Sequence, residues 1–389
     1  MTTMNKRLQE VSPSVTLAIS SEAKRLKSQG IPVIGFGAGE PDFDTPDFIK
    51  DAAIQAIKEG FTRYTPVSGI QELKEAICQK FQKDNNLHYK PSEVAVSCGA
   101  KHSIFNLIQV LCNEGDEVVI PAPYWLSYVE MVRIAGAKPV VIPCTEDTDF
   151  KITPQMLKEN LNERTKIVIL NSPSNPTGMI YTSQELSDLG DILKTSETMI
   201  ISDEIYEHIV YEQKHYSIAS IVPELKDRTI VVNGHSKAYA MTGWRIGYAA
   251  GAENIIQSLS KYQSHSTSNP CSIAQKAAHS ALTADQSFLS ENVATFRKRR
   301  DLMVSMLNDI PGVSCLKPSG AFYAFANISN LGRGKSCEVA EALLKEAHVA
   351  LVPGKAFGAD DFVRLSYALD LDSISEGLER FARWAKTKK

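Results

Sequence analysis

The chain has 389 residues, of which 43% are hydrophobic and 22% charged, and its formal net charge is −3. This composition is ordinary for a soluble globular protein. The slight acidity argues against a nucleic-acid partner, which usually demands a basic bias. No apolar run is long enough to span a bilayer, and the N-terminal residues lack the apolar core of a signal peptide. We therefore expect two packed lobes with neither a membrane nor a nucleic acid as partner.

The cysteines give no sign of a disulfide framework or a metal site. There are seven, an odd number, and none forms a Cys-x-x-Cys pair. We expect no metal and a reducing, cytoplasmic setting.

Short apolar runs alternate with helical patterns over the first two thirds of the chain. The runs cover residues 93–96, 117–120, 139–142, 166–170, 199–201 and 229–232. Near-continuous apolar runs are typical of strands buried on both faces of a largely parallel sheet. Amphipathic segments such as 104–111 and 184–189 lie between them, and Thr182 or Ser183 is the expected N-cap of the second. The alternation predicts a layered α/β domain.

The pattern changes from about residue 285. Helices are expected around residues 295–302 and 337–347, and short strands around 321–325 and 363–367. We interpret this region, together with the first forty or so residues, as a second, α+β lobe.

Ligands bind at the carboxyl ends of the strands in an open α/β sheet, so the residues just after each run are the candidates for a binding site. Gly99 and Ala100 follow the first run at the start of a helix, where backbone N–H groups can approach an anion. Tyr124 and Trp125 follow the second run, and either the ring of one of them stacks on a flat ligand or both are plain core.

Two later strand ends carry polar side chains. Two prolines stiffen the loop 171–178 and present Asn175. Asp203 directly follows a buried run, and a buried carboxylate needs a cationic partner. That partner is either a basic side chain in a structural salt bridge or the ring nitrogen of a cofactor. Tyr206 lies three residues further on.

Residues 234–247 read GHSKAYAMTGWRIG and follow the last apolar run. Lys237 leaves a buried strand there, which is costly unless its amine reacts or is paired. Lysine amines form Schiff bases with carbonyls, and pyridoxal phosphate is the aldehyde that enzymes most often use. Ser236 and Arg245 are suited to hold its phosphate. A surface lysine beside a loop is the alternative.

These strings, in this order, resemble the class I (fold type I) aminotransferases, most closely the branch of bacterial aspartate aminotransferases with Met-Thr-Gly-Trp-Arg-Ile-Gly after the lysine. The resemblance covers nearly the whole chain, including residues 37–43 (GAGEPDF) and 362–367 (FVRLSY). It implies a three-layer α/β/α large domain with a mostly parallel seven-stranded sheet, and a smaller α+β domain from both chain ends. The implied boundaries are 1–47 and 286–389 for the small domain and 48–285 for the large, cofactor-binding domain.

The resemblance also implies roles for individual residues around pyridoxal 5'-phosphate. Lys237 is the catalytic Schiff-base lysine. The residues implied to bind the cofactor are Gly99, Ala100, Lys101, Trp125, Asn175, Asp203, Tyr206, Ser236, Arg245 and, from the neighbouring subunit of a homodimer, Tyr64. The residues implied to bind the substrate are Gly39, Lys101, Trp125, Asn175 and Arg364, with Arg364 holding the α-carboxylate.

The implied reaction moves the amino group of L-aspartate to 2-oxoglutarate, giving oxaloacetate and L-glutamate. Lys101 stands where relatives contact the distal carboxylate. Ser12 stands where relatives that also accept prephenate carry a lysine, which favours aspartate. The sequence departs from the usual pattern at Gly234, where a serine is common, and at His102, where a glutamine is common. A broader specificity for aromatic amino acids or prephenate, and a β-lyase on the same scaffold, remain alternatives.

Two other classes fit less well. A nicotinamide dehydrogenase would use the glycines of residues 33–39, but Pro41 and Pro46 follow where the helix of a dinucleotide-binding turn must begin. A transcription regulator built on this scaffold needs an added DNA-binding domain, and only about thirty residues precede the first motif.

Overall fold

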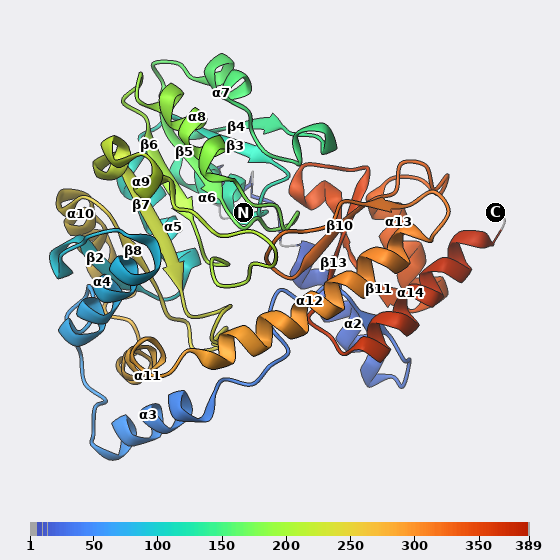
Figure 1. Cartoon of the computed structure of the whole chain (residues 1–389), viewed down its shortest axis with the longest axis horizontal. Helices are drawn as coiled ribbons and strands as arrows, with labels where there is room; N and C mark the ends of the chain where they lie inside the picture. Colours follow the sequence, from blue (N-terminus) through green and yellow to red (C-terminus); the bar gives the residue numbers. More distant parts are fainter. Residues whose placement is uncertain (1–5, 10, 14, 388–389) are drawn as a thin grey trace.

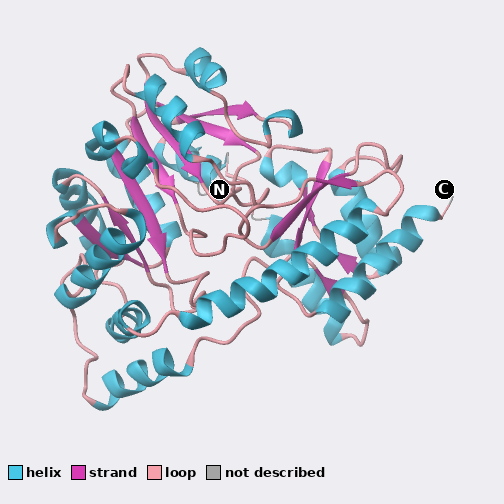
Figure 2. Cartoon of the chain, viewed as in Figure 1, coloured by secondary structure: helices cyan, strands magenta, loops and turns pink. Residues whose placement is uncertain are grey.

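The computed structural model describes residues 6–9, 11–13 and 15–387. A seven-stranded sheet lies between two layers of helices, and two smaller sheets lie beside it with long helices against them (Figures 1 and 2). Within the described residues, no helix is both long and apolar enough to cross a lipid bilayer.

The large sheet has the strand order β2-β8-β7-β6-β5-β3-β4. Its strands are β2 (Val94–Ser97), β3 (Glu117–Ala122), β4 (Lys138–Pro143), β5 (Thr165–Asn171), β6 (Met199–Asp203), β7 (Thr229–Gly234) and β8 (Gly247–Ala250). Only β8 runs antiparallel to its neighbours. Six of the seven strands match the apolar runs, and the mostly parallel sheet is confirmed. The sequence reasoning missed β8.

Helices cover both faces of this sheet. One layer contains α5 (Ala100–Leu111), α6 (Ser127–Ala135) and α10 (Glu253–Ser264), and the other contains α4 (Gln71–Asn85), α7 (Pro154–Asn160), α8 (Ser183–Leu193), α9 (Ile218–Ile221) and α11 (Ser272–Thr283), with α3 (Asp47–Lys58) packed on α11. Strand β3 shows the alternation that joins the layers: Val118 and Ile120 pack with the α5 and α6 side, whereas Val119 packs with α8. Both faces are apolar, as expected for a sheet between helices.

The smaller part is built from both ends of the chain. An antiparallel sheet contains β12 (Val352–Pro353), β13 (Phe362–Ser366), β10 (Tyr323–Asn327) and β9 (Ser314–Cys315), and a parallel pair joins β1 (Ile34–Gly35) to β11 (Val349–Ala350). The helices here are α2 (Val15–Ser28), α12 (Ser287–Asn308), α13 (Ser336–Ala342) and α14 (Leu371–Lys386). The α+β character and the use of both ends are therefore confirmed, whereas the domain boundaries stay a prediction.

The remaining elements are short. They are α1 (Lys6–Gln9), η1 (Pro91–Glu93), η2 (Glu146–Thr148), η3 (Pro223–Arg228), η4 (Leu343–Ala347) and η5 (Gly354–Phe357). The helix expected at 337–347 is α13 followed by the π-helical segment η4. Helix α8 begins as predicted: Thr182 Oγ1 accepts from the Glu185 backbone N–H at 3.2 Å, and the Glu185 carboxylate accepts from the Thr182 N–H at 2.7 Å.

Candidate active site

A cavity of about 690 Å³ opens at the carboxyl ends of β5, β6 and β7, where the large sheet faces the small sheets. Most of the residues predicted for the site line it. They are Gly39, Ala100, Lys101, Trp125, Asn175, Asp203, Tyr206, Ser236, Lys237, Arg245 and Arg364. Gly99 lies just behind this lining, against Arg245. Residues that are far apart in the chain therefore converge on one space.

Lys237 follows β7 and is partly buried. Its Nζ donates to the Gly39 carbonyl at 2.5 Å. Burial and, after it, the positive charge of Arg364 lower the pKa of this amine to about 8, although Glu40 and Asp203 act in the opposite direction. A lysine with this pKa is largely neutral in mildly alkaline solution, which is the state a nucleophile or a base requires.

Asp203 ends β6 and is 4% exposed. Its Oδ2 accepts from the Tyr128 hydroxyl at 2.5 Å, and its Oδ1 accepts from the Ile205 backbone N–H at 3.3 Å. Burial raises the pKa of Asp203 to about 6, although these hydrogen bonds act in the opposite direction. No lysine or arginine in the described part of the chain forms a salt bridge with it, so the structural salt bridge considered as the alternative is absent there.

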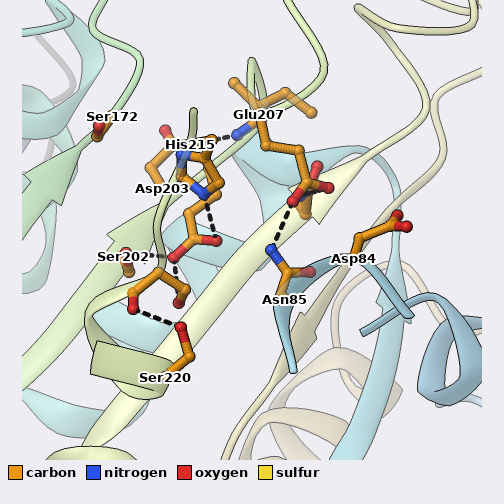
Figure 3. A network of polar contacts seen from close by, with 12 residues as sticks. Asp84, Asn85, Ser172, Ser202, Asp203, Glu207, His215 and Ser220 are labelled. Carbon is orange, nitrogen blue, oxygen red and sulfur yellow. Dashed lines mark hydrogen bonds and ion pairs between the residues drawn. The ribbon is translucent and has the colours of Figure 1, made fainter. Parts of the chain in front are cut away.

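Two further buried carboxylates follow Asp203 in the chain, and both are satisfied within the protein (Figure 3). Glu204 accepts from the hydroxyls of Ser202 at 2.7 Å and Ser217 at 2.6 Å, and it contacts His215 Nε2 at 3.0 Å. Neither Glu204 nor Glu207 lines the cavity. Asp203 is therefore the acid of this cluster that faces the ligand space.

Glu207 is held by Lys80, by Asn85 Nδ2 at 2.9 Å and by Asn233 Nδ2 at 2.6 Å. Burial works against its ionisation, but Lys80 and the nearby His208 keep its pKa at about 2. This carboxylate therefore ties α4 to the strands that end at the cavity.

Arg364 lies on β13 and is 2% exposed. Its Nη1 donates to Asn175 Oδ1 and its Nη2 to the Gly37 carbonyl, both at 3.0 Å, while the Nε–H has no partner among the described residues. The guanidinium also lies over the Tyr323 ring, 4.4 Å from its centroid. A fixed guanidinium that retains donor capacity at a cavity wall is suited to a carboxylate.

The opposite end of the cavity is formed by the start of α5 and by Arg245. Gly99 precedes the helix with φ +92°, and a Cβ there would lie 2.6 Å from Arg245 Nη2. The guanidinium donates to the carbonyls of Thr242 at 2.8 Å and Cys98 at 3.2 Å. A helix N-terminus beside an arginine is suited to an anion, and Ser236 belongs to the same lining.

Lys101 and Trp125 contact each other. The Lys101 ammonium lies 4.8 Å from the centroid of the Trp125 ring, and its pKa is lowered by burial and by Arg245. Both residues line the cavity, and their roles in ring stacking and in binding a distal carboxylate stay predictions.

Tyr64 and Gly234 lie outside the cavity lining. Tyr64 is 91% exposed, so its role as a contact to a neighbouring subunit stays a prediction. The unusual Gly234 has a packing reason, because a Cβ there would lie 2.8 Å from the Gly247 Cα on β8. Serine does not fit at this position without a shift of the strand pair.

Sequence reasoning missed several residues of the lining. They include Glu40, Asn171, Tyr128, Thr242 and Tyr323. Tyr323 bonds the Tyr206 hydroxyl at 2.9 Å, and Asn171 Oδ1 accepts from the Asn175 N–H at 2.9 Å. Asn171 and Glu40 stand inside strings that had been singled out. Tyr323 lies in a predicted strand, where nothing distinguishes it from core.

The cavity fits pyridoxal phosphate. The buried carboxylate of Asp203 forms no salt bridge with a described side chain, which leaves it available to a ring nitrogen that carries a proton. A helix N-terminus with an arginine suits the phosphate, and the lysine amine suits the aldehyde carbon.

The family model described as aminotransferase class I and II matches residues 31–381. The aspartate aminotransferase of Geobacillus stearothermophilus is 51% identical and covers 98% of this chain and 99% of its own length. The aspartate/prephenate aminotransferase of Nitrosomonas europaea is 46% identical, over 97% of this chain and 98% of its own. The structure of the Thermus thermophilus aspartate aminotransferase with maleate superposes with a TM-score of 0.95 at 41% identity, covering 98% and 100% of the two chains.

The family model spans elements of both lobes, and the relatives match nearly the whole chain. These matches agree with the lysine, the buried acid and the two arginines that line the cavity. The chain belongs to the class I and II aminotransferases, and it is a transaminase dependent on pyridoxal phosphate.

Proposed function

We propose that the protein catalyses the reversible transfer of the amino group of L-aspartate to 2-oxoglutarate, giving oxaloacetate and L-glutamate. The observation that carries the proposal is that Arg364 and Lys101 line the same cavity as the Lys237 amine, in addition to the Arg245 assigned to the phosphate. A dicarboxylic substrate needs one cation for each carboxylate. The aspartate aminotransferase names of relatives at about half identity, and the dicarboxylate maleate in the Thermus thermophilus structure, support the same choice.

Each residue has a distinct part in the proposed reaction. When bound, pyridoxal phosphate supplies an aldehyde and a conjugated ring that takes up an electron pair. Arg364 holds the substrate α-carboxylate. Lys237 removes the proton from the substrate α-carbon and delivers it again as an acid. Asp203 holds a proton on the ring nitrogen, while Tyr206 and Asn175 donate to the phenolic oxygen.

The decisive experiment is a panel of amino donors and 2-oxo acceptors offered to the purified protein. Aspartate with 2-oxoglutarate is expected to give the highest kcat/KM, with glutamate and oxaloacetate in the reverse direction. Preference for an aromatic donor, or release of pyruvate and ammonia from a β-substituted amino acid, contradicts the proposal.

A second candidate is joint activity on aspartate and prephenate, favoured by the name of the Nitrosomonas europaea relative. Ser12 counts against it: this exposed residue has no cationic side chain, and its backbone N–H bonds Glu130 at 3.3 Å. Prephenate therefore belongs in the panel as an acceptor.

We also propose a cytoplasmic homodimer whose active sites are shared between subunits. Ile54 and Ile57 on α3 are 47% and 55% exposed, and Tyr64 follows them at 91%. Ile54 and Ile57 are three residues apart and so form an exposed apolar strip on α3, which favours burial against a partner. All seven cysteines are free thiols, which supports a reducing compartment.

A further inference from the structure

Tyr128 belongs to the lining of the cavity, and its side chain contacts Asp203. Its hydroxyl donates to Asp203 Oδ2 at 2.5 Å, and among the described residues it is the one side chain that hydrogen-bonds this carboxylate. The other bond comes from a backbone N–H. Nothing in the roles assigned so far requires a tyrosine here.

The position of the hydroxyl is well fixed. Tyr128 is the second residue of α6 and is 2% exposed, and its backbone N–H donates to the Trp125 carbonyl at 3.0 Å. Its ring meets the Trp125 ring edge-on, with the centroids 5.2 Å apart. Tyr128 therefore contacts both Trp125 and Asp203, two of the side chains that line the cavity.

Tyr128 stays a donor at any working pH. Burial, followed by the charge of Asp203, raises the pKa of the phenol well above its usual value. A hydrogen bond to an ionised carboxylate stabilises that form. The other titratable groups that act on Asp203 are Glu204, which raises its pKa, and Lys237, which lowers it, and Tyr206 lies nearby.

We propose that Tyr128 is a positioning residue that keeps Asp203 ionised and aimed at the ring nitrogen of pyridoxal phosphate. The inference rests on the proposed role of Asp203. Without the hydroxyl, burial acts on the carboxylate unopposed by any side-chain donor. Asp203 then takes up a proton at a higher pH and loses its attraction for a protonated ring nitrogen.

The test is cofactor binding by the cofactor-free protein between pH 5.5 and 8.5, followed by tryptophan fluorescence. Tyr128→Phe removes the hydroxyl and keeps the ring contact with Trp125. Cofactor affinity is expected to fall on the acid side, and in the variant this fall should lie about one pH unit higher than in the wild type. The variant should therefore bind pyridoxal phosphate roughly fivefold more weakly than the wild type near pH 6 and equally well above pH 8. A ratio of variant to wild-type dissociation constants that stays flat with pH overturns the inference.

Three further variants separate the possible causes. Tyr211→Phe removes a different buried hydroxyl, which donates to the Ala321 carbonyl at 2.6 Å, and is expected to leave the fall in affinity at its wild-type pH. Tyr128→His restores a ring N–H donor and is expected to move this fall back towards its wild-type pH, also serving if Tyr128→Phe does not fold. Asp203→Asn tests the acid itself: unchanged cofactor affinity contradicts the role of Asp203, whereas weakened affinity beside a flat Tyr128→Phe ratio contradicts only the role of Tyr128.

Discussion

Lys237 is held in an environment that disfavours its own charge, and this has a consequence for stability. Its pKa is about 8 in the folded chain against 10.5 for an ordinary lysine. The unfolded chain therefore binds more protons between these values, and stability rises with pH across that window. Below pH 8 the folded protein bears the full cost of a charged, partly buried amine.

We therefore expect Lys237→Met to stabilise the cofactor-free protein at pH 7, by about 1–2 kcal/mol after allowance for partial exposure. The gain should shrink as the pH rises from 8 to 10.5, because the wild-type amine then becomes neutral in both states. Chemical denaturation at several pH values measures it. Lys158→Met, at an exposed lysine, is the control. An equal gain in the free energy of unfolding in that variant would contradict a specific cost of the charge at Lys237.

His235 is buried two residues before Lys237, and neither ring nitrogen has a partner among the described residues. Burial lowers its pKa from 6.5 to about 3. The unfolded chain takes up a proton below pH 6.5 that the folded chain refuses, so stability is lost as the pH falls towards 3.

His235→Phe is expected to remove this loss. Between pH 7 and pH 4 the free energy of unfolding of the variant should fall by about 3 kcal/mol less than that of the wild type. The new ring would pack among Tyr239 and Tyr248, whose centroids lie 5.4 and 5.7 Å from the imidazole. Unfolding curves at pH 7 and pH 4 provide the comparison. The exposed His88 supplies the control in His88→Asn, which should behave as wild type at both pH values.

Removal of Arg364 and removal of Lys101 are expected to affect different ranges of amino donors. Arg364→Ala should lower kcat/KM for every amino donor, by about a hundredfold, because the α-carboxylate is common to all of them. Lys101→Ala should cost roughly tenfold with aspartate and little with an aromatic donor. Steady-state kinetics on both donors tests this, and equal losses in Lys101→Ala would remove it as the distal-carboxylate contact.

The sequence was informative about residues that stand in strings at strand ends, such as Lys237, Asp203 and Asn175. It was not informative about Tyr128 or Tyr323, which reach the cavity through packing between elements. Their neighbours in the chain do not reveal which face of a helix or strand meets the site.

At the scale of elements, the start of α5 shows why a glycine is needed. Alanine at position 99 would have to adopt φ +92° and would place its Cβ against the Arg245 guanidinium. We expect Gly99→Ala to displace Arg245 and to weaken cofactor binding by roughly tenfold or more. Titration of the cofactor-free variant with pyridoxal phosphate measures this.

Gly115→Ala is the matched control, because Gly115 also has a positive φ, of +89°, yet has open space around it. Both variants carry backbone strain, so only the clash with Arg245 distinguishes them. If both variants bind the cofactor equally weakly, Gly99 is needed only for its backbone conformation and not to leave space for Arg245.

The strands with uninterrupted apolar runs were predictable, because burial on both faces leaves a clear pattern. Strand β8 was not, since Gly247–Ala250 is short, contains glycine and lies within the lysine string. Its antiparallel pairing with β2 and β7 depends on the chain returning through residues 235–246, which no local periodicity encodes.

At the scale of the whole molecule, the site depends on both ends of the chain. Gly39 and Arg364 come from opposite ends, and the pair β1–β11 brings those ends together. Helix α12 runs from the large part to the small part (Figure 1), and its Arg299 holds Asp42 with two hydrogen bonds of 2.7 and 2.8 Å. The segment that carries Gly39 is thus fixed to the helix that spans the molecule.

A shared active site makes a prediction about mixed subunits. Lys237→Ala removes the amine from its own site, whereas Tyr64→Ala is expected to weaken phosphate binding in the site of the neighbour. A dimer with one subunit of each kind regains one intact site, since Tyr64 from the first variant completes the site that holds Lys237 of the second.

Unfolding and refolding the two variants together at limiting cofactor should therefore restore about a quarter of wild-type activity, because half the dimers are mixed and each has one complete site. Each variant refolded alone provides the baseline. Ile57→Glu in both chains should abolish the recovery by placing a charge on the exposed strip of α3. Activity that equals the average of the separate variants would show that each subunit builds its site unaided, and Tyr64 would then be an ordinary surface residue.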